Sequence, residues 1–235
     1  MLAEAVVMAA GEGIRMRPLT ERYAKPVLPI DGRPVIATLL HELAAAGFAR
    51  ATVVTGHLAE QVEALAGRPG AFGLEIRFVR QPGPTGSADA VSCALAAGAP
   101  LPCLVTAADT VFVPGDVGRF VAAFGDNGSA GAIAVRRDPA PDPPHRWPIR
   151  VRDGLVERVL DDDRANPLTG APLWVVGRDV AACLCLDAAP YELSNAFQRA
   201  IDGGETIRGI EISRTRDLTR PIDLVQENFI YLGSM

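Results

Sequence analysis

The chain has 235 residues, of which 49% are hydrophobic and 22% are charged, and this composition excludes extensive disorder. Its formal net charge is −5, and its arginines are scattered along the chain and form no basic runs, so we expect no nucleic acid partner. The length suits one α/β domain, and we expect a single domain over residues 1–235.

The first predicted element is a short buried strand near the N-terminus. Its apolar run, Ala5 to Ala10, follows no basic residue and is too short for a signal-peptide core or a membrane span. The four cysteines, at positions 93, 103, 183 and 185, form no C-x-x-C pair and lie in apolar stretches, which favours reduced core thiols. We therefore expect a cytoplasmic protein without a membrane partner.

Strands and helices alternate from this first strand to residue 107. Alternation at this spacing is typical of a parallel sheet covered by helices on both faces, with ligands in the crevice at the carboxyl ends of the strands. The sequence thus predicts an α/β fold with a Rossmann-like, doubly wound, mixed and mostly parallel sheet in three layers. The predicted elements after the first strand are a helix at Pro34 to Gly47, a strand at Ala51 to Thr55, a helix at Leu58 to Leu65, a strand at Leu74 to Val79, a helix at Ser87 to Ala97 and a strand at Leu101 to Ala107.

A proline-rich segment from Asp138 to Pro148 interrupts the alternation. Its five prolines cannot sustain a helix or a central strand, which predicts a loop or crossover that divides the chain into residues 1–137 and residues 138–235. The elements predicted beyond it are strands at Ile149 to Arg152, Val156 to Leu160 and Leu173 to Val176, a helix at Tyr191 to Ile201, a strand at Thr206 to Ile212 and a final helix at Pro221 to Leu232.

The loop after the first strand combines glycines with cations. In Gly11-Glu12-Gly13 the glycines let backbone N–H groups approach phosphate oxygens, and Arg15 and Lys25 follow closely enough to converge on the same anion. The third glycine of a dinucleotide-binding loop and the Gly-Lys-Ser/Thr ending of a P-loop are both missing. Lys25 is the only lysine of the chain, which indicates a site that needs a compact ammonium. A tight turn without a ligand and a solvated surface lysine stay open as alternatives.

The segment AAGEGIRMRPLTERYAKPVLPI closely resembles the signature of the sugar-1-phosphate nucleotidyltransferases, G-x-G-[ST]-R-[LM]-x-P-L-T followed by P-K-P. The resemblance implies the fold of the nucleotide-diphospho-sugar transferases, with a nucleotide-binding half at 1–137 and an acceptor-binding half with a closing helix at 138–235. Ile14 departs from the signature, which has a hydroxyl residue there, so one hydrogen bond to phosphate would be lost. The resemblance implies that Arg15 and Lys25 are catalytic, because they would bind the triphosphate and stabilise charge at the α-phosphorus. The nucleotide-binding residues that it implies in this loop are Ala10, Gly11, Glu12 and Gly13.

A second segment, QPGPTGSA, follows a predicted strand and opens a predicted helix. Ser87 is expected to be the N-cap of that helix, and Gly86 permits close approach. The segment resembles Q-P-x-x-x-G-[TS]-A of the same family, in which the glutamine and the glycine backbone read the base. The resemblance therefore adds Gln81, Pro82, Gly86 and Ser87 to the nucleotide-binding residues, and a capped loop without a ligand is the alternative.

Two aspartates are candidates for a magnesium site. Asp109 follows the strand that ends at residue 107, at the edge of the crevice where Mg²⁺ bound to phosphates needs oxygen ligands, although an isolated aspartate there is also a common turn former. Near the end of the chain, DLTRPIDL resembles the family's D-[VI]-x-T-P-E-D-L, which implies Asp217 as the second metal ligand and leaves Asp223 as the runner-up. In this register Pro221 begins the last helix and Asp223 is a charge at its N-terminus. We expect Mg²⁺ as the cofactor.

The acceptor half departs further from the family. Trp147-Pro148 stands where relatives that bind sugar phosphates have Tyr-Gly, and a proline lacks the backbone donor. The run DDDR at residues 161–164 occupies the region of the family's Glu-Lys-Pro, so Arg164 is the candidate clamp for the acceptor phosphate. Gly170 precedes a predicted strand, as a glycine does in members of the family. The candidates for acceptor binding are therefore Trp147, Arg164 and Gly170, and a solvated acidic turn with packing tryptophans is the alternative.

These motifs together predict a Mg²⁺-dependent nucleotidyltransferase that joins a nucleoside triphosphate to a sugar 1-phosphate and releases pyrophosphate. A close variant is a cytidylyltransferase for a non-sugar phosphate such as phosphocholine, in which Trp147, Trp174 and the acidic run hold a quaternary ammonium. The rival class is a non-catalytic relative that binds nucleotide or nucleotide sugar and regulates a partner.

The combination of triphosphate and metal residues opposes that rival, whereas Ile14 and the altered acceptor region favour it. An NAD-dependent enzyme is excluded by the missing third glycine and the missing acidic residue for a ribose. The end of the chain at Met235 leaves no room for the C-terminal β-helix of some relatives, so we expect no second activity. The base, the acceptor and the formation of a homo-oligomer stay open.

Overall fold

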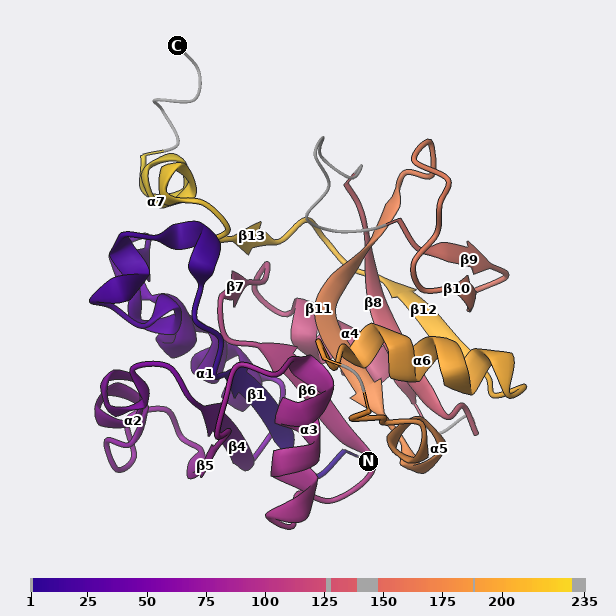
Figure 1. Cartoon of the computed structure of the whole chain (residues 1–235), viewed down its shortest axis with the longest axis horizontal. Coiled ribbons are helices and arrows are strands. Elements are labelled where there is room, and N and C mark those ends of the chain that lie inside the picture. The colour runs from indigo at the N-terminus through magenta and orange to yellow at the C-terminus, as the bar shows by residue number, and fades with distance from the viewer. Residues whose placement is uncertain (1, 126–127, 139–147, 188, 230–235) are drawn as a thin grey trace.

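The computed structural model of the chain describes residues 2–125, 128–138, 148–187 and 189–229. They form a three-layer α/β structure around a nine-stranded sheet (Figure 1). From one edge of the sheet to the other, the strands are β5 (Glu75–Arg80), β4 (Arg50–Thr55), β1 (Ala5–Ala9), β6 (Cys103–Ala107), β11 (Leu168–Val176), β8 (Gly131–Arg137), β12 (Ile207–Glu211), β10 (Leu155–Arg158) and β9 (Arg150–Arg152).

The two halves of the sheet differ in strand direction. Strands β5, β4, β1 and β6 are all parallel. Strand β11 lies antiparallel between β6 and β8 and connects the two halves, and β12 is parallel to β8. Strands β10 and β9 complete the sheet in antiparallel pairs. The doubly wound, mixed sheet predicted from the sequence is therefore confirmed.

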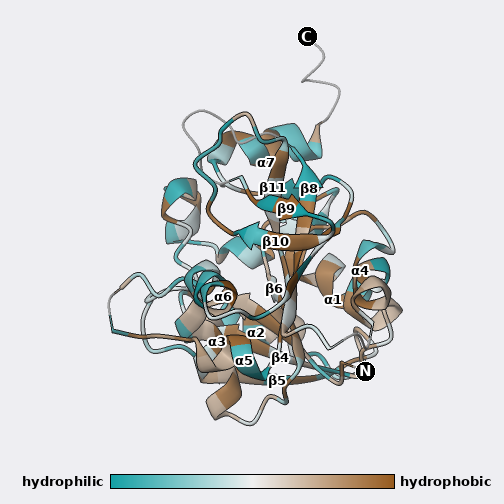
Figure 2. Cartoon of the chain, turned by 90° about the vertical axis from the view of Figure 1, so that its right-hand side faces the viewer, coloured by the Kyte–Doolittle hydropathy of each residue, from teal (hydrophilic) through white to brown (hydrophobic). Residues whose placement is uncertain are grey.

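Helices cover both faces of the sheet because the buried strands present apolar side chains on both faces. In β1, Ala5 and Val7 pack into one core cluster and Val6 into the other, as the two-residue period of a strand requires. Figure 2 shows α1 and α4 to the right of the central strands and α3 and α6 to the left. The helices are α1 (Val35–Ala45), α2 (Ala59–Ala66) and α4 (Asp116–Phe124) on the first cluster, and α3 (Ser87–Ala96), α5 (Arg178–Ala182) and α6 (Leu193–Asp202) on the second.

The C-terminal segment returns to the loop that follows β1. Strand β13 (Arg216–Asp217) pairs antiparallel with β7 (Thr110–Val111), and α7 (Pro221–Asn228) packs on β2 (Pro29–Ile30), which pairs with β3 (Arg33–Pro34). A small apolar cluster lies beneath this contact. It consists of Met16, Leu28, Ile30, Val35 and Leu218, and it joins the first loop to residues more than 180 positions later.

Most predicted elements are present with ends shifted by one to five residues. The largest shift is that of β11, which begins at Leu168 and not at Leu173. Helix α4 and strand β8 lie between residues 107 and 138, where no element was predicted. The last helix begins at Pro221 as predicted, and its predicted end at Leu232 lies outside the described residues. Within the described ranges, no helix is both long enough and apolar enough to cross a membrane.

Candidate active site

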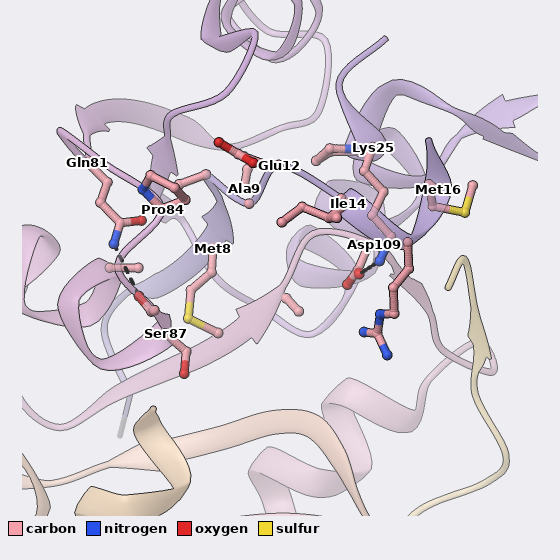
Figure 3. A pocket seen from close by; sticks show the side chains of 18 of the residues that line it. Met8, Ala9, Glu12, Ile14, Met16, Lys25, Gln81, Pro84, Ser87 and Asp109 are labelled. Atoms are coloured by element: carbon pink, nitrogen blue, oxygen red, sulfur yellow. Dashed lines mark hydrogen bonds and ion pairs between the residues drawn. The ribbon is translucent and has the colours of Figure 1, made fainter. Parts of the chain in front are cut away.

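A cavity of about 390 Å³ opens at the carboxyl ends of the parallel strands. Its walls come from the loops after β1, β5 and β6, because parallel strands bring these loops to the same edge of the sheet. Figure 3 shows Gln81, Pro84 and Ser87 at one end of this first cavity and Lys25 with Asp109 at the other. The predicted nucleotide residues that line it are Ala10, Gly11, Glu12, Gly13, Gln81, Gly86 and Ser87, and Pro82 is the one that does not.

The first loop places backbone groups along the wall of this cavity. Gly13 has a left-handed backbone (φ +61°), and its carbonyl accepts hydrogen bonds from the Met16 backbone N–H (2.8 Å) and from Thr20 Oγ1 (2.9 Å). These bonds begin the 3₁₀ turn Ile14–Met16, from which Arg15 reaches the cavity. The loop is therefore fixed before any ligand binds.

Gly11 offers a direct test of phosphate approach. A Cβ atom built on Gly11 meets no described atom within 4 Å, and its φ lies outside the left-handed range. Gly11→Ala should therefore leave the melting temperature unchanged but raise the KM for the nucleoside triphosphate roughly tenfold, the equivalent of one good hydrogen bond to a charged group. Gly32→Ala is the matched control for an open glycine outside the cavity, although its left-handed φ of +72° adds strain. An unchanged KM for Gly11→Ala would rule out close approach of phosphate at this position.

Lys25 and Asp109 form an ion pair where the first cavity meets a second one. Lys25 lies on the 3₁₀ turn Lys25–Val27, and only 14% of its side chain is exposed, compared with 29% for Asp109. Both residues line both cavities, as Arg15 does. The only lysine of the chain is therefore a mostly buried cation at the junction of the two cavities, which rules out the alternative of a solvated surface lysine.

The second cavity, of about 360 Å³, contains the other predicted metal ligand. The pairing of β13 with β7 sets Asp217 opposite Thr110, next to Asp109 in the chain. Asp217 accepts hydrogen bonds from Thr110 Oγ1 (2.8 Å) and Thr215 Oγ1 (3.0 Å), and it forms an ion pair with Arg136 Nη1 (2.8 Å). Both aspartates predicted as metal ligands therefore line one cavity.

The two carboxylates fit a magnesium ion that is shared with phosphates. Within the described ranges, no three His, Cys, Asp or Glu side chains come together as a metal site, so the protein would supply these two carboxylates at most. Mg²⁺ in such sites commonly takes one or two carboxylates, and phosphates and water complete its shell. The runner-up, Asp223, lines neither cavity, and its Oδ2 caps α7 by accepting from the backbone N–H groups of Thr219 and Arg220.

The segment after β5 forms the other end of the first cavity. Gln81 is buried, and its Nε2 donates to Thr85 Oγ1 (3.1 Å), the Gly86 carbonyl (3.1 Å) and Asp89 Oδ2 (2.7 Å). These bonds hold the side-chain amide in one orientation at the cavity wall. Gly86 is needed for packing as well, because a Cβ atom on it would lie 2.4 Å from the carbonyl oxygen of Tyr191.

The prediction that Ser87 caps α3 is wrong. Gly86 is the N-cap and Ser87 is the first helical residue. The Ser87 hydroxyl donates to Glu192 Oε2 (2.6 Å) and accepts from the Leu193 backbone N–H (2.8 Å). It therefore ties the start of α3 to the start of α6, and the hydroxyl is engaged there instead of capping its own helix.

Of the predicted acceptor residues, only Gly170 is found at a cavity in the described part of the chain. Gly170 lines the second cavity together with Trp174, whereas Arg164 lies in the exposed turn before β11 and lines neither cavity. Trp147 lies outside the described residues. The remaining wall of the second cavity is mostly apolar and comes from β8, β11 and the chain around β9 and β10. Its apolar members are Ile133, Ile149, Val159, Leu160, Ala171, Pro172 and Trp174.

The acidic run before Arg164 is partly structural. Asp161 is 2% exposed and accepts hydrogen bonds from Arg150 (2.6 Å) and Asn166 (3.2 Å). Burial raises the pKa of Asp161, but the bonds from Asn166, from the Asp163 backbone and from Arg150 outweigh burial and hold the pKa below its usual value. Asp161 therefore fastens the turn and does not line the cavity, contrary to its proposed contact with a quaternary ammonium.

One charged residue that lines a cavity was not a candidate in the sequence analysis. Arg136 is 3% exposed, lies near the end of β8 and lines the second cavity. The signal in the sequence was a charged residue directly after the apolar run AIAV, but no strand was predicted there.

Comparisons with known proteins give the family and the fold of the chain. A model of the MobA-like NTP transferase domain matches residues 5–179. Glucose-1-phosphate thymidylyltransferase of Streptomyces griseus is 27% identical over 251 aligned positions, which cover 97% of this chain and 66% of the relative. 2-Aminoethylphosphonate cytidylyltransferase of Lancefieldella rimae is 47% identical over 57 residues, 24% of this chain and 23% of the relative. The chain thus spans slightly less than two thirds of the first of these relatives.

A solved structure with the same fold is UDP-glucose pyrophosphorylase from Acinetobacter baumannii. Its TM-score is 0.79 at 17% sequence identity, and the alignment covers 98% of this chain and 93% of that protein. At this identity the similarity establishes the fold alone.

Proposed function

The chain belongs to the family of MobA-like NTP transferase domains, and we propose that it joins a nucleoside triphosphate to a sugar 1-phosphate, giving a nucleotide sugar and pyrophosphate. One observation carries the proposal: two cavities meet at Arg15, Lys25 and Asp109. The first cavity has the glycine loop and Gln81 for a nucleotide. The second has room for a phosphorylated acceptor, and the shared residues lie where the two substrates would react.

The chemistry needs no general base from the protein. An oxygen of the acceptor phosphate is already anionic, and it forms a bond to the α-phosphorus as the bond from that phosphorus to the bridging β-phosphate oxygen breaks. Negative charge builds up around the α-phosphorus, and Lys25 and Arg15 lie where they can stabilise it. Mg²⁺ would be held by Asp109 and Asp217 and would neutralise phosphate charge.

The second candidate function is cytidylyl transfer to a non-sugar phosphate or phosphonate. Two observations favour it. The relative from Lancefieldella rimae, which is the more similar one locally, is named as a cytidylyltransferase for an aminoalkyl phosphonate. The part of the second cavity that β8, β11 and the chain around β9 and β10 form is mostly apolar, whereas a sugar presents many hydroxyl groups that need hydrogen-bond partners. A non-catalytic nucleotide-binding relative would not need the pair of aspartates beside Lys25 and Arg15.

The proposal also covers the compartment and the partners of the protein. We place the reaction in the cytoplasm, which fits the four cysteines, all free in the structure. The partners are then the two small-molecule substrates, and the formation of a homo-oligomer stays open.

Pyrophosphate release tests the proposal and separates its two forms. The purified chain is incubated with Mg²⁺, with each of ATP, GTP, CTP, UTP and dTTP in turn, and with sugar 1-phosphates, phosphocholine or 2-aminoethylphosphonate as the acceptor. Release with a sugar 1-phosphate supports the first form, and release with CTP and a non-sugar acceptor supports the second. Stabilisation by a nucleotide without release for any pair would contradict an enzyme for these substrates and favour the non-catalytic relative.

A further inference from the structure

Arg136 is a buried cation with most of its donors unused. Only 4% of its side chain is exposed, and it lies on β8 between β11 and β12 (Figure 1). Its neighbour Arg137 points to the other face, as the strand period requires, where 65% of its side chain is exposed and it pairs with Glu211 (3.0 Å). Two adjacent arginines on the same strand therefore have opposite environments.

The surroundings of Arg136 do not satisfy its guanidinium. A guanidinium carries five N–H donors, and the partner that the structure gives Arg136 is Asp217, through Nη1. Its Nε is fully buried and has no partner among the described residues. A buried donor without an acceptor is costly, so a guanidinium kept in this state fits a site that is completed by a ligand.

The position of Arg136 limits which ligand that is. Three cations line the second cavity in the described part of the chain, namely Arg15, Lys25 and Arg136, and of these only Arg136 does not also line the first cavity. Arg15 and Lys25 are at the junction, where the triphosphate is expected. Arg164, the sequence-predicted clamp, lines neither cavity. Arg136 is therefore the cation available to an anion that lies wholly in the second cavity.

We propose that Arg136 binds the phosphate or phosphonate group of the acceptor. The planar guanidinium suits two oxygens of a tetrahedral anion, and water screens the charge of Arg136 less than that of a surface arginine because its side chain is almost fully buried. Asp217 holds the guanidinium in place through Nη1 and leaves its other donors to the anion. This inference rests on the proposed function, since it assigns the acceptor to the second cavity.

The test compares Arg136→Met and Arg136→Lys with Arg137→Met as the matched control. With an accepted substrate pair, Arg136→Met should raise the KM for the acceptor at least about 30-fold and leave the KM for the nucleoside triphosphate within about twofold. Arg136→Lys keeps the positive charge beside Asp217 but loses the planar guanidinium, so it should raise the KM for the acceptor by less than Arg136→Met does. Arg137→Met should behave as the unaltered chain. Equal rises in both KM values, or a fall in kcat alone, would make Arg136 a structural partner of Asp217 and overturn the proposal.

A binding measurement separates this inference from the proposed function. Millimolar methylphosphonate should raise the melting temperature of the unaltered chain and of Arg137→Met, but not that of Arg136→Met, whereas the shift produced by the nucleoside triphosphate should persist in all three. If no substrate pair reacts and methylphosphonate still needs Arg136, the anion site stands and the proposed reaction fails. Methylphosphonate binding that Arg136→Met retains, or that the unaltered chain lacks, would overturn the anion site. If Arg136→Met does not fold, Arg136→Lys takes its place: its melting-temperature shift with methylphosphonate should be smaller than that of Arg137→Met, and a shift of the same size would overturn the anion site.

Discussion

Replacing Asp109 by asparagine should reduce pyrophosphate release by on the order of 10²–10³-fold, the loss usual when a group that stabilises charge in the transition state is removed. Asparagine keeps the shape of the side chain and removes the charge that pairs with Lys25 and that would hold Mg²⁺. Because 29% of the Asp109 side chain is exposed, the fold should tolerate the change. The measurement is kcat for the pair found in the substrate panel.

The metal role of Asp109 has a readout that does not depend on turnover. In the unaltered chain, stabilisation by the nucleoside triphosphate should increase when Mg²⁺ is added, and in Asp109→Asn this increase should be lost. Asp179→Asn is the matched control, because Asp179 is an exposed aspartate in the first turn of α5 and lines neither cavity. Full turnover of Asp109→Asn would show that this aspartate is only a turn former.

The nucleotide half of the site was predictable because its signals are local. The glycine loop, Lys25 and Asp109 each follow directly from a short sequence pattern, and parallel pairing of β1 with β6 then brings them together without further information. Helix α4 was missed although Val117, Phe120, Val121 and Phe124 recur at helical spacing.

The acceptor half was less predictable because its contacts join distant parts of the chain. Strand β8 pairs with β11 and with β12, which lie more than 30 and more than 70 residues later, and Arg136 itself pairs with Thr169 of β11, so its burial depends on contacts that no local pattern indicates. The Ser87 hydroxyl likewise binds Glu192 and Leu193, so a capping rule that considers neighbours in sequence assigned it wrongly. Arg164 was predicted from its place in a family motif, but the buried Asp161 anchors the turn that carries Arg164, and Arg164 lines neither cavity.

Exchanging Lys25 for arginine should lower kcat about 100-fold even though the positive charge is kept. Lys25 is 14% exposed and its ammonium contacts Asp109 at the junction of the two cavities, so a larger planar guanidinium cannot occupy the same place. The loss should appear in kcat more than in the KM for the nucleoside triphosphate, because the charge at the α-phosphorus develops in the transition state. Lys25→Met should lower kcat further, since it also removes the charge.

The comparison with Arg17 decides whether Lys25 acts by position or by charge alone. Arg17 belongs to the same loop, but 51% of its side chain is exposed, it pairs with Glu12 and it lines neither cavity. Arg17→Met therefore removes a nearby positive charge without touching the junction, and its kcat should stay within about twofold of the unaltered chain. If Arg17→Met and Lys25→Met lose activity equally, the loop supplies only a diffuse positive field. If Lys25→Arg keeps full activity, the reaction does not need the compact ammonium. The presence of a single lysine beside 22 arginines would then have no catalytic explanation.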